Sequence, residues 1–303
     1  MSVASPVVTV HDPANRSDRI SRGIAVALAL YLAAATWPIW RFAQASGETA
    51  PLAAHLAILG YTLALLAAPL VLRRPALDWI VLTIGPVMYV ELRWIIAGLG
   101  APHRDALVVS WEAALFPGNP SATLAPRWHV GAVSELLHLA YAAYYLLVYV
   151  PPIVLYARRQ RDAFVSTMLA LTIVYGVCFI TYGLFPVDGP RYLIGPAAAP
   201  EGPIRSFVLE LLDRGSSRGT AFPSSHVAAS IVSALCALRY QRRVGIVVAV
   251  VTAALVVATV YGGFHYAVDA LVGVILGVLA WLGSAILGKA PDSREAQTAT
   301  AAS

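Results

Sequence analysis

Charged residues are scarce in this 303-residue chain: they make up 12% of it, whereas hydrophobic residues make up 59%. So little charge excludes an ordinary soluble protein, and the mean hydropathy of +0.71 is typical of an integral membrane protein. The two cysteines, Cys178 and Cys236, both lie in apolar segments, so the sequence indicates neither a disulfide framework nor a paired metal site. Each membrane span takes about 20 apolar residues, which leaves no room for a sizeable soluble domain.

The chain contains many long apolar stretches, and eight of them predict membrane-spanning helices. The expected spans are 23–42, 51–72, 78–99, 132–157, 163–185, 226–241, 243–261 and 264–287. We therefore expect an all-α, polytopic membrane helix bundle. The weakest spans are 78–99, which carries charged residues, and 226–241, which is short.

The net charge of +5 comes from short arginine clusters between apolar runs, which favours membrane orientation over nucleic-acid binding. Clusters precede the first span and follow the second, fourth and sixth, and two basic residues lie in the C-terminal tail. The positive-inside rule places these clusters and both termini in the cytoplasm. The segments 100–131 and 186–225 then lie on the outer face. An alternative for the first span is a cleaved signal peptide ending at the small-residue triplet 43–45.

Two segments of the predicted outer face have the pattern of amphipathic helices that lie at the membrane interface. The stretch 105–116 alternates apolar residues with Trp111 and Glu112. In 204–214 the apolar residues follow helical spacing, and the charged residues lie largely opposite. The second helix either rests on the bilayer beside a site or merely fills a long loop.

The start of the sixth span has the features of an anion site. Ser224, Ser225 and His226 follow Pro223, which suits the first turn of a helix. Free amides and hydroxyls at a positive helix end attract anions, and His226 adds a titratable donor. Arg218, eight residues earlier, is a candidate for a second positive charge on a bound phosphate.

The start of the eighth span and the end of the fifth carry the other polar motifs. His265 and Asp269 are four residues apart and are expected on one helix face, where the carboxylate can hold one ring nitrogen and leave the other as a nucleophile. Arg191 follows a turn-rich exit from the fifth span, and is either a phosphate ligand or a headgroup anchor. The predicted topology places all three motifs on the same side of the membrane.

Pro-Ser-Ser-His at 223–226 and His265-x-x-x-Asp269 resemble the second and third signatures of the type 2 phosphatidic acid phosphatase superfamily. The resemblance covers roughly 100–285 and implies a six-helix catalytic core within the bundle. It implies that His265 attacks phosphorus, that Asp269 orients it, and that His226 acts as general acid and then base. Ser225 and the adjacent amides of the Ser224 turn would cradle the phosphate, with no metal and no cofactor.

Two departures from that family point to one of its branches. The family's usual first signature is absent, and only the dipeptide Pro190-Arg191 resembles part of it. In the third signature Thr259 stands where the family usually has an arginine. Tyr261 lies nearby and is a further phosphate-binding candidate. Both features, together with the segment 112–120 and the helix 135–145, resemble the branch that includes inositol phosphorylceramide synthases.

Ionisable residues inside the predicted spans are costly and need partners. Glu135, His138 and Tyr141 form a polar stripe along one face of the fourth span, which would hold a lipid headgroup or an acceptor hydroxyl. The competing interpretation is a structural ion pair between Arg93 and Glu135. Glu91 and Arg93 do not face each other and need separate partners. His55 and His103 join no recognisable motif.

These observations predict a metal-independent lipid phosphate phosphatase that works through a phosphohistidine at the extracytoplasmic face of a bacterial-type inner or plasma membrane. One alternative is a phosphotransferase that moves a phospho-headgroup, such as phosphoinositol, to a lipid or polyol alcohol. A second is a non-enzymatic lipid transporter or binding protein, which would need symmetry-related broken helices. The expected organisation is a tail 1–22, helices 23–99, a catalytic membrane domain 100–288 and a tail 289–303.

Overall fold

The computed structural model describes residues 13–68 and 70–287, and within these ranges it is built from helices without a β-strand. A single isolated bridge joins Val187 to Thr220. The predicted all-α class is confirmed. The helices are α1 (Pro13–Ser46), α2 (Ala50–Ala67), α3 (Leu70–Leu99), α4 (Asp105–Leu115), α5 (Pro120–Arg127), α6 (Gly131–Ala142), α7 (Tyr144–Ala157), α8 (Arg161–Leu184), α9 (Pro190–Ile194), α10 (Pro203–Gly215), α11 (Ser225–Tyr240), α12 (Arg242–Tyr261) and α13 (Ala267–Leu287).

Most of these helices match the membrane spans expected from hydropathy. Six described helices, α1, α2, α3, α8, α12 and α13, are long and apolar enough to cross a membrane. The helices α6 and α7 meet the same criteria only as a pair, which is bent by 45° at Ala143 and, taken as one unit, is a seventh candidate span. The eighth expected span is α11, which has only 16 residues and packs against α7, α8, α12 and α13. The protein is an integral membrane protein with a polytopic helical bundle.

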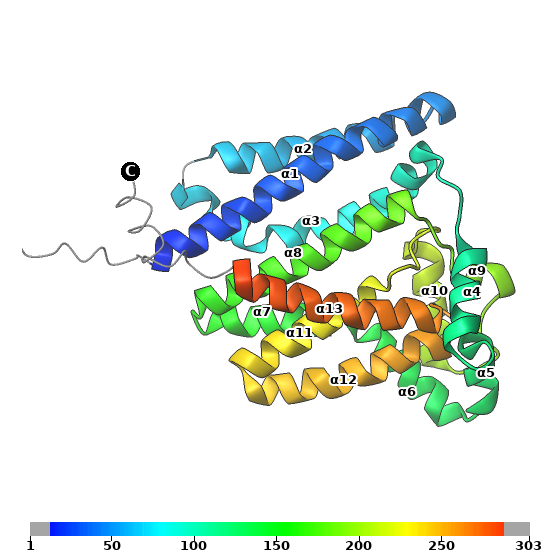
Figure 1. Cartoon of the computed structure of the whole chain (residues 1–303). Coiled ribbons are helices and arrows are strands. Elements are labelled where there is room, and N and C mark those ends of the chain that lie inside the picture. Colours follow the sequence, from blue (N-terminus) through cyan, green and yellow to red (C-terminus); the bar gives the residue numbers. More distant parts are fainter. Residues whose placement is uncertain (1–12, 69, 288–303) are drawn as a thin grey trace, which may run out of the picture.

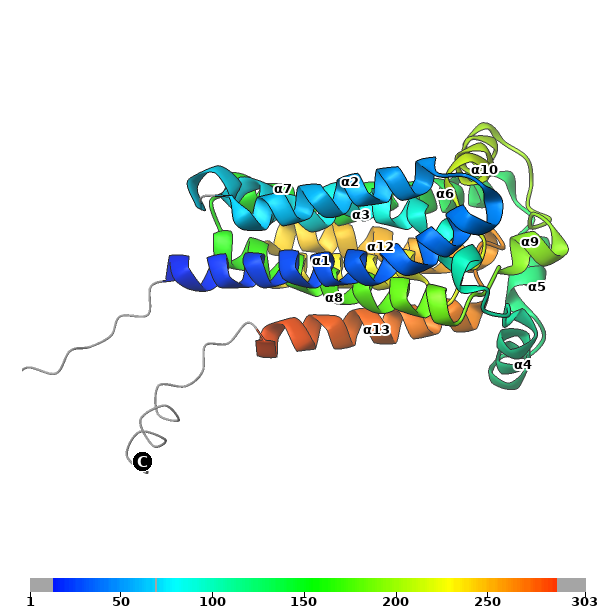
Figure 2. The ribbon, with the colours of Figure 1, turned by 90° about the horizontal axis from the view of Figure 1, so that it is seen from above.

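The two ends of the bundle differ in the way they are built (Figures 1 and 2). At one end α1 begins, α13 ends, and α7–α8 and α11–α12 are joined by short turns that carry the arginine clusters. There Arg161 pairs with Asp18 of α1 and Asp78 of α3, at 2.8 and 2.9 Å. The opposite end carries the shorter helices α4, α5, α9 and α10. The predicted interfacial helices are α4 and α10, whereas α5 and α9 were not predicted.

Small residues let α13 pack directly against α11. A Cβ atom added to Gly273 would lie 2.8 Å from the carbonyl oxygen of Ser224, and one added to Gly277 would lie 2.7 Å from that of Ala228. In membranes, where burial of apolar surface does not favour helix association, close backbone approach through two small residues four apart is a main source of stability. These glycines therefore fix the start of α11 against α13.

The charged groups of α3 have partners that the sequence did not reveal. Glu91 is buried, and its Oε1 lies 3.1 Å from Nδ1 of His55 on α2, so His55 is not an isolated histidine. Nε2 of His55 is 3.0 Å from the carbonyl oxygen of Leu32 on α1. Arg93 lies over the Trp94 ring, and the carboxylate of Glu135 bonds to α10 instead. The suggested Arg93–Glu135 tether is thus replaced by a His55–Glu91 contact that joins α2 to α3 and, through Leu32, to α1.

Candidate active site

Three segments that are far apart in sequence meet at the end of the bundle that carries the short helices. They are the α8–α9 connection with α9, the α10–α11 loop with the start of α11, and the α12–α13 turn. They line a pocket of about 40 Å³ that contains Arg191, His226 and His265, which we call the Arg191–His265 pocket. Its other lining residues are Tyr89, Tyr141, Asp188, Tyr192, Leu212, Ser216, Ser217, Thr220, Ala221 and Phe264. The predicted convergence of the three motifs is present.

His265 lies in the turn that precedes α13. The residue is 5% exposed, and its Nδ1 lies 2.9 Å from the carbonyl oxygen of Ala221 and 3.6 Å from Oδ2 of Asp269. A carbonyl oxygen can only accept a hydrogen bond, so Nδ1 carries the proton and Nε2 is left with a lone pair. The expectation that His265 and Asp269 share a helix face is corrected: α13 begins at Ala267, so only Asp269 is helical.

Asp269 does more than orient the histidine. Its Oδ2 accepts a hydrogen bond of 2.8 Å from the backbone N–H of Tyr266, which closes the first turn of α13. Its backbone carbonyl accepts one of 3.1 Å from the N–H of Ser224. The residue that stands next to the candidate nucleophile therefore also joins α13 to the start of α11, where the second histidine lies.

His226 lies in the first turn of α11, which Ser224 caps by accepting a hydrogen bond from the N–H of Val227. Its ring stacks on Tyr141, with centroids 5.2 Å apart, and contacts Tyr144 at 4.2 Å. The ring centroids of His226 and His265 are 6.0 Å apart. Both imidazoles thus line the Arg191–His265 pocket.

The serines before His226 have protein partners. The N–H of Ser225 donates to the phenol oxygen of Tyr182 at 3.1 Å, and the N–H of Ser224 donates to Asp269. Both side chains are buried, and neither serine lines the Arg191–His265 pocket. α11 begins at Ser225, so Pro223 precedes the helix and Ser224 is its cap.

Arg191 is the positive charge of the pocket. Its guanidinium is only 9% exposed and bonds to Oδ1 of Asp213 at 3.1 Å, to the Tyr192 hydroxyl and to Ser216. Asp213 belongs to α10, so the amphipathic helix holds the arginine over the pocket. Arg218 lies outside the pocket lining: it is 62% exposed, 3.5 Å from Oδ2 of Asp188.

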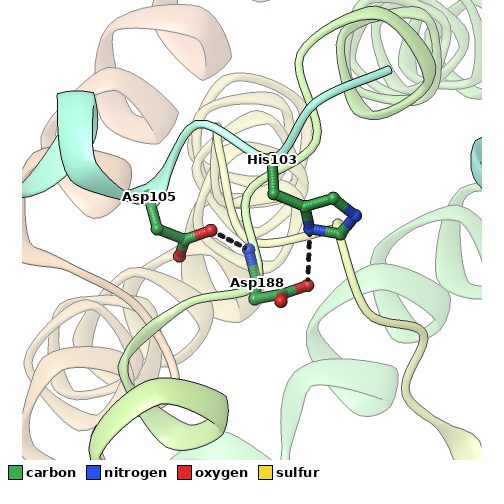
Figure 3. A group of neighbouring side chains, drawn as sticks. All are labelled: His103, Asp105 and Asp188. Carbon is green, nitrogen blue, oxygen red and sulfur yellow. Dashed lines mark hydrogen bonds and ion pairs between the residues drawn. The ribbon is translucent and has the colours of Figure 1, made fainter. Parts of the chain in front are cut away.

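A group of three side chains, His103, Asp105 and Asp188, lies at the edge of the pocket, which Asp188 lines (Figure 3). Their potential ligand atoms lie within 4.8 Å of one another, which is close enough to consider a metal. However, Oδ2 and Oδ1 of Asp105 accept hydrogen bonds from the N–H groups of Asp188 and Gly189, at 3.0 and 2.9 Å. Nδ1 of His103 lies 2.9 Å from Asp188. The group therefore serves as a brace for the segment that leads to Arg191.

The helix α4 supplies a second carboxylate to the site, which the sequence did not identify as functional. Glu112 is 2% exposed, and its Oε2 accepts a hydrogen bond of 3.1 Å from the N–H of Val268 at the start of α13. Burial raises the pKa of Glu112, while the backbone hydrogen bonds partly oppose the shift. Asp105 and Glu112, two helical turns apart, thus hold the Arg191 and His265 segments in place. Their spacing on an amphipathic helix is the signal that could have revealed them.

The remaining predicted residues are divided between the pocket and its surroundings. Tyr141 lines the pocket. Glu135 lies outside it and accepts hydrogen bonds from the N–H groups of Ile204 and Arg205, so it caps α10. Nδ1 of the buried His138 bonds to the carbonyl oxygen of Ser134. Tyr261 is buried and donates to the carbonyl oxygen of Trp128. The stripe 135–141 therefore contributes one ring to the pocket, and its other members support neighbouring helices.

Comparison with known proteins agrees with this arrangement. The family model described as the PAP2 superfamily matches residues 107–283, more than half of the chain and all three segments of the pocket. No curated protein and no solved structure matches the chain. The matched region starts within α4, two residues after Asp105, and ends within α13, so it contains Glu112, His226 and His265. The chain belongs to the PAP2 superfamily, and this membership supports a phosphatase or phosphotransferase type of activity.

Proposed function

We propose that the protein is a lipid phosphate phosphatase that works without a metal through a phosphohistidine on His265. The observation that carries the proposal is the hydrogen bond from His265 Nδ1 to the Ala221 carbonyl, with Asp269 at 3.6 Å, because it leaves Nε2 of this pocket-lining ring with a lone pair that can attack phosphorus. Arg191 supplies the positive charge that a phosphoryl group needs.

In the proposed first step, the lone pair of His265 Nε2 forms a bond to phosphorus while the bond from phosphorus to the lipid oxygen breaks. His226 donates a proton to the leaving oxygen, which departs as an alcohol. Asp269 stabilises the positive charge that develops on the His265 ring. In the second step a water attacks phosphorus, His226 takes its proton, and the nitrogen–phosphorus bond breaks to release inorganic phosphate.

The alternative, a phosphotransferase of the inositol phosphorylceramide synthase type, differs only in the acceptor of the second step. The lining of the pocket favours water, because Asp188 is the one carboxylate among its described lining residues and no amide side chain is among them to bind the hydroxyls of a polyol.

Phosphate release provides the direct test. Purified protein would be incubated with a panel of phospholipid and isoprenoid phosphates, with and without inositol. We expect release of inorganic phosphate that a chelator leaves unchanged and that vanadate inhibits, because vanadate resembles the trigonal-bipyramidal transition state. Loss of turnover with chelator and its return with magnesium or zinc would contradict the mechanism. A new lipid product that appears only with inositol would establish the transferase instead.

We also propose that the pocket faces away from the cytoplasm. The arginine-rich turns lie at the opposite end of the bundle, and anionic cytoplasmic lipids attract such clusters by about 1 kcal/mol per basic residue. An impermeant thiol reagent applied to intact cells should label Ala198→Cys, at an exposed site near the pocket, and should leave Gln160→Cys unlabelled. Both native cysteines are buried, which keeps the background low. The reverse labelling pattern would place the active site in the cytoplasm.

A further inference from the structure

A second, larger cavity lies between α3 and α7, next to the Arg191–His265 pocket. It has a volume of about 240 Å³ and is lined by α3, α6, α7, α8 and α10 and the start of α11. The lining residues include Gly85, Tyr89, Tyr145, Val148, Phe179 and Leu211. We call it the α3–α7 cavity. Its α3 wall lies outside the segment that matches the family.

The α3–α7 cavity adjoins the Arg191–His265 pocket. Tyr89, Tyr141, Leu212, Ser216 and His226 line both spaces, whereas His265 lines only the smaller one. A group that bonds to His226 can therefore extend from the smaller pocket into the larger cavity. In the proposed mechanism that group is the alcohol to which His226 gives its proton.

The walls of the cavity suit a hydrocarbon chain. Its tyrosine hydroxyls are largely paired with protein groups: Tyr144 with Tyr175 at 2.8 Å, and Tyr149 with the carbonyl oxygen of Leu82 at 2.7 Å. No carboxylate or guanidinium is among the described lining residues. A polyol placed here would lose hydrogen bonds to water and gain few in return, whereas an apolar chain would lose none.

The rim of the cavity carries apolar side chains that are exposed on the outer surface of the bundle. Val90 on α3 is 36% exposed, Tyr145 on α7 53%, and Leu211 on α10 40%. Since α3 and α7 belong to membrane spans, a chain that leaves the cavity between them enters the bilayer. α10 covers the cavity at its outer end through Val208, Leu211 and Leu212.

We propose that the α3–α7 cavity binds the hydrocarbon chain of the leaving alcohol, admitted sideways from the bilayer between α3 and α7, with α3 as the wall that sets which chains are accepted. This inference rests on the proposed phosphatase function and names the apolar part of its substrate. The substrate is then a lipid monophosphate whose chain begins next to the phosphate oxygen on the His226 side.

A larger side chain at Gly85 would fill part of the cavity without a steric clash. A Cβ added there meets no atom within 4 Å, so Gly85→Leu would extend into open space without displacing the backbone. Replacing a helical glycine also favours the helix, so the variant should fold. Gly60 on α2 is a matched control, because it is also helical, also free of neighbours within 4 Å, and absent from the lining of both spaces.

The test compares hexyl, decyl and hexadecyl phosphate with p-nitrophenyl phosphate, using wild type, Gly85→Leu and Gly60→Leu. For wild type and Gly60→Leu we expect kcat/KM to rise with chain length, by at most about fourfold per methylene until the cavity is filled. For Gly85→Leu we expect the rise to disappear, with at least a tenfold loss on hexadecyl phosphate and an unchanged rate on p-nitrophenyl phosphate. Equal effects of Gly85→Leu on all four substrates, or none, would overturn the proposal.

A binding readout separates failure of this proposal from failure of the phosphatase function. A hexadecyl phosphonate with a diazirine in its chain would be photo-crosslinked to the protein and the adducts mapped by mass spectrometry. Adducts on α3 and α7 that Gly85→Leu removes would support the cavity even if no phosphate were released. Adducts elsewhere on the surface, unchanged by the substitution, would overturn it while leaving measured hydrolysis intact.

Discussion

His265→Ala should reduce turnover of every substrate to background, a loss of at least about 10⁴-fold, because the proposed mechanism forms the bond to phosphorus through His265 alone. The loss should be the same for good and poor leaving groups. Initial rates on a lipid phosphate and on p-nitrophenyl phosphate, measured with the same purified variant, check this. Residual activity well above background would mean that another residue is the nucleophile.

His226→Ala is the matched comparison, since its ring stands only 6.0 Å from that of His265. General acid catalysis is worth about 10²–10⁴-fold, so we expect the phosphorylation step to slow by that factor on lipid phosphates and much less on p-nitrophenyl phosphate, whose leaving group needs no proton. The first turnover, measured as a burst of released alcohol or p-nitrophenol, reports this step. Because His226 also serves as base toward water, later turnovers should be slow on both substrates, and the phosphorylated enzyme formed from p-nitrophenyl phosphate should accumulate and be trapped as an acid-labile phosphoprotein. Equal losses in the first turnover for both leaving groups would defeat the assignment of roles.

Arg191→Ala should lower kcat by roughly 10²–10³-fold, the usual cost of removing one preorganised donor to a developing charge. The structure favours this because Arg191 is the arginine that lines the Arg191–His265 pocket, held there by Asp213, Tyr192 and Ser216. Arg191→Lys should recover only part of the rate, because an ammonium cannot reproduce the forked contacts of a guanidinium.

Two other arginines provide graded controls for that experiment. Arg218 lies outside the pocket lining and pairs with Asp188 at 3.5 Å, so Arg218→Ala should cost far less than Arg191→Ala. Arg214 is 79% exposed and pairs with Glu210 on α10, and Arg214→Ala should leave the rate unchanged. The kcat values of the three variants on one lipid phosphate show the order of the three losses. If Arg218→Ala were as severe as Arg191→Ala, Arg218 would have to approach the substrate when it binds.

The spans could be predicted from the sequence because a membrane requires long apolar segments whatever the tertiary structure is. The expected spans 163–185 and 243–261 agree with α8 and α12 within two residues at each end. The bend at Ala143 was not predicted, and no local sequence signal marks it. The short helices α5 and α9 were also missed, since eight and five residues give too little periodicity to recognise.

The candidate catalytic residues could be predicted because His226, His265 and Asp269 stand in short local motifs. Their supports could not, because each acts across a large separation in the chain. The hydrogen bond between His265 and the Ala221 carbonyl joins residues 44 positions apart, and that from the Tyr266 hydroxyl to Asp105 joins residues 161 positions apart. The placement in the inositol phosphorylceramide synthase branch, which rested on single motif departures, stays a prediction. Likewise, the partners of Glu91 and Glu135 depend on how α2 and α10 pack, which hydropathy does not encode.

The hydrogen bond from Val268 to Glu112 spans 156 residues and has a consequence for biosynthesis. The chain is made from its N-terminus, so α4 is complete long before α13 leaves the ribosome. Until α13 is inserted, Glu112 lacks the Val268 amide, the Ser224 amide lacks the Asp269 carbonyl, and the proposed nucleophile is missing. Under the proposed mechanism, a partly inserted chain therefore cannot remove phosphate from the lipids around it. Insertion of the last helix adds His265 together with the contacts that hold its segment, so the mechanism predicts that activity begins only when membrane insertion is complete.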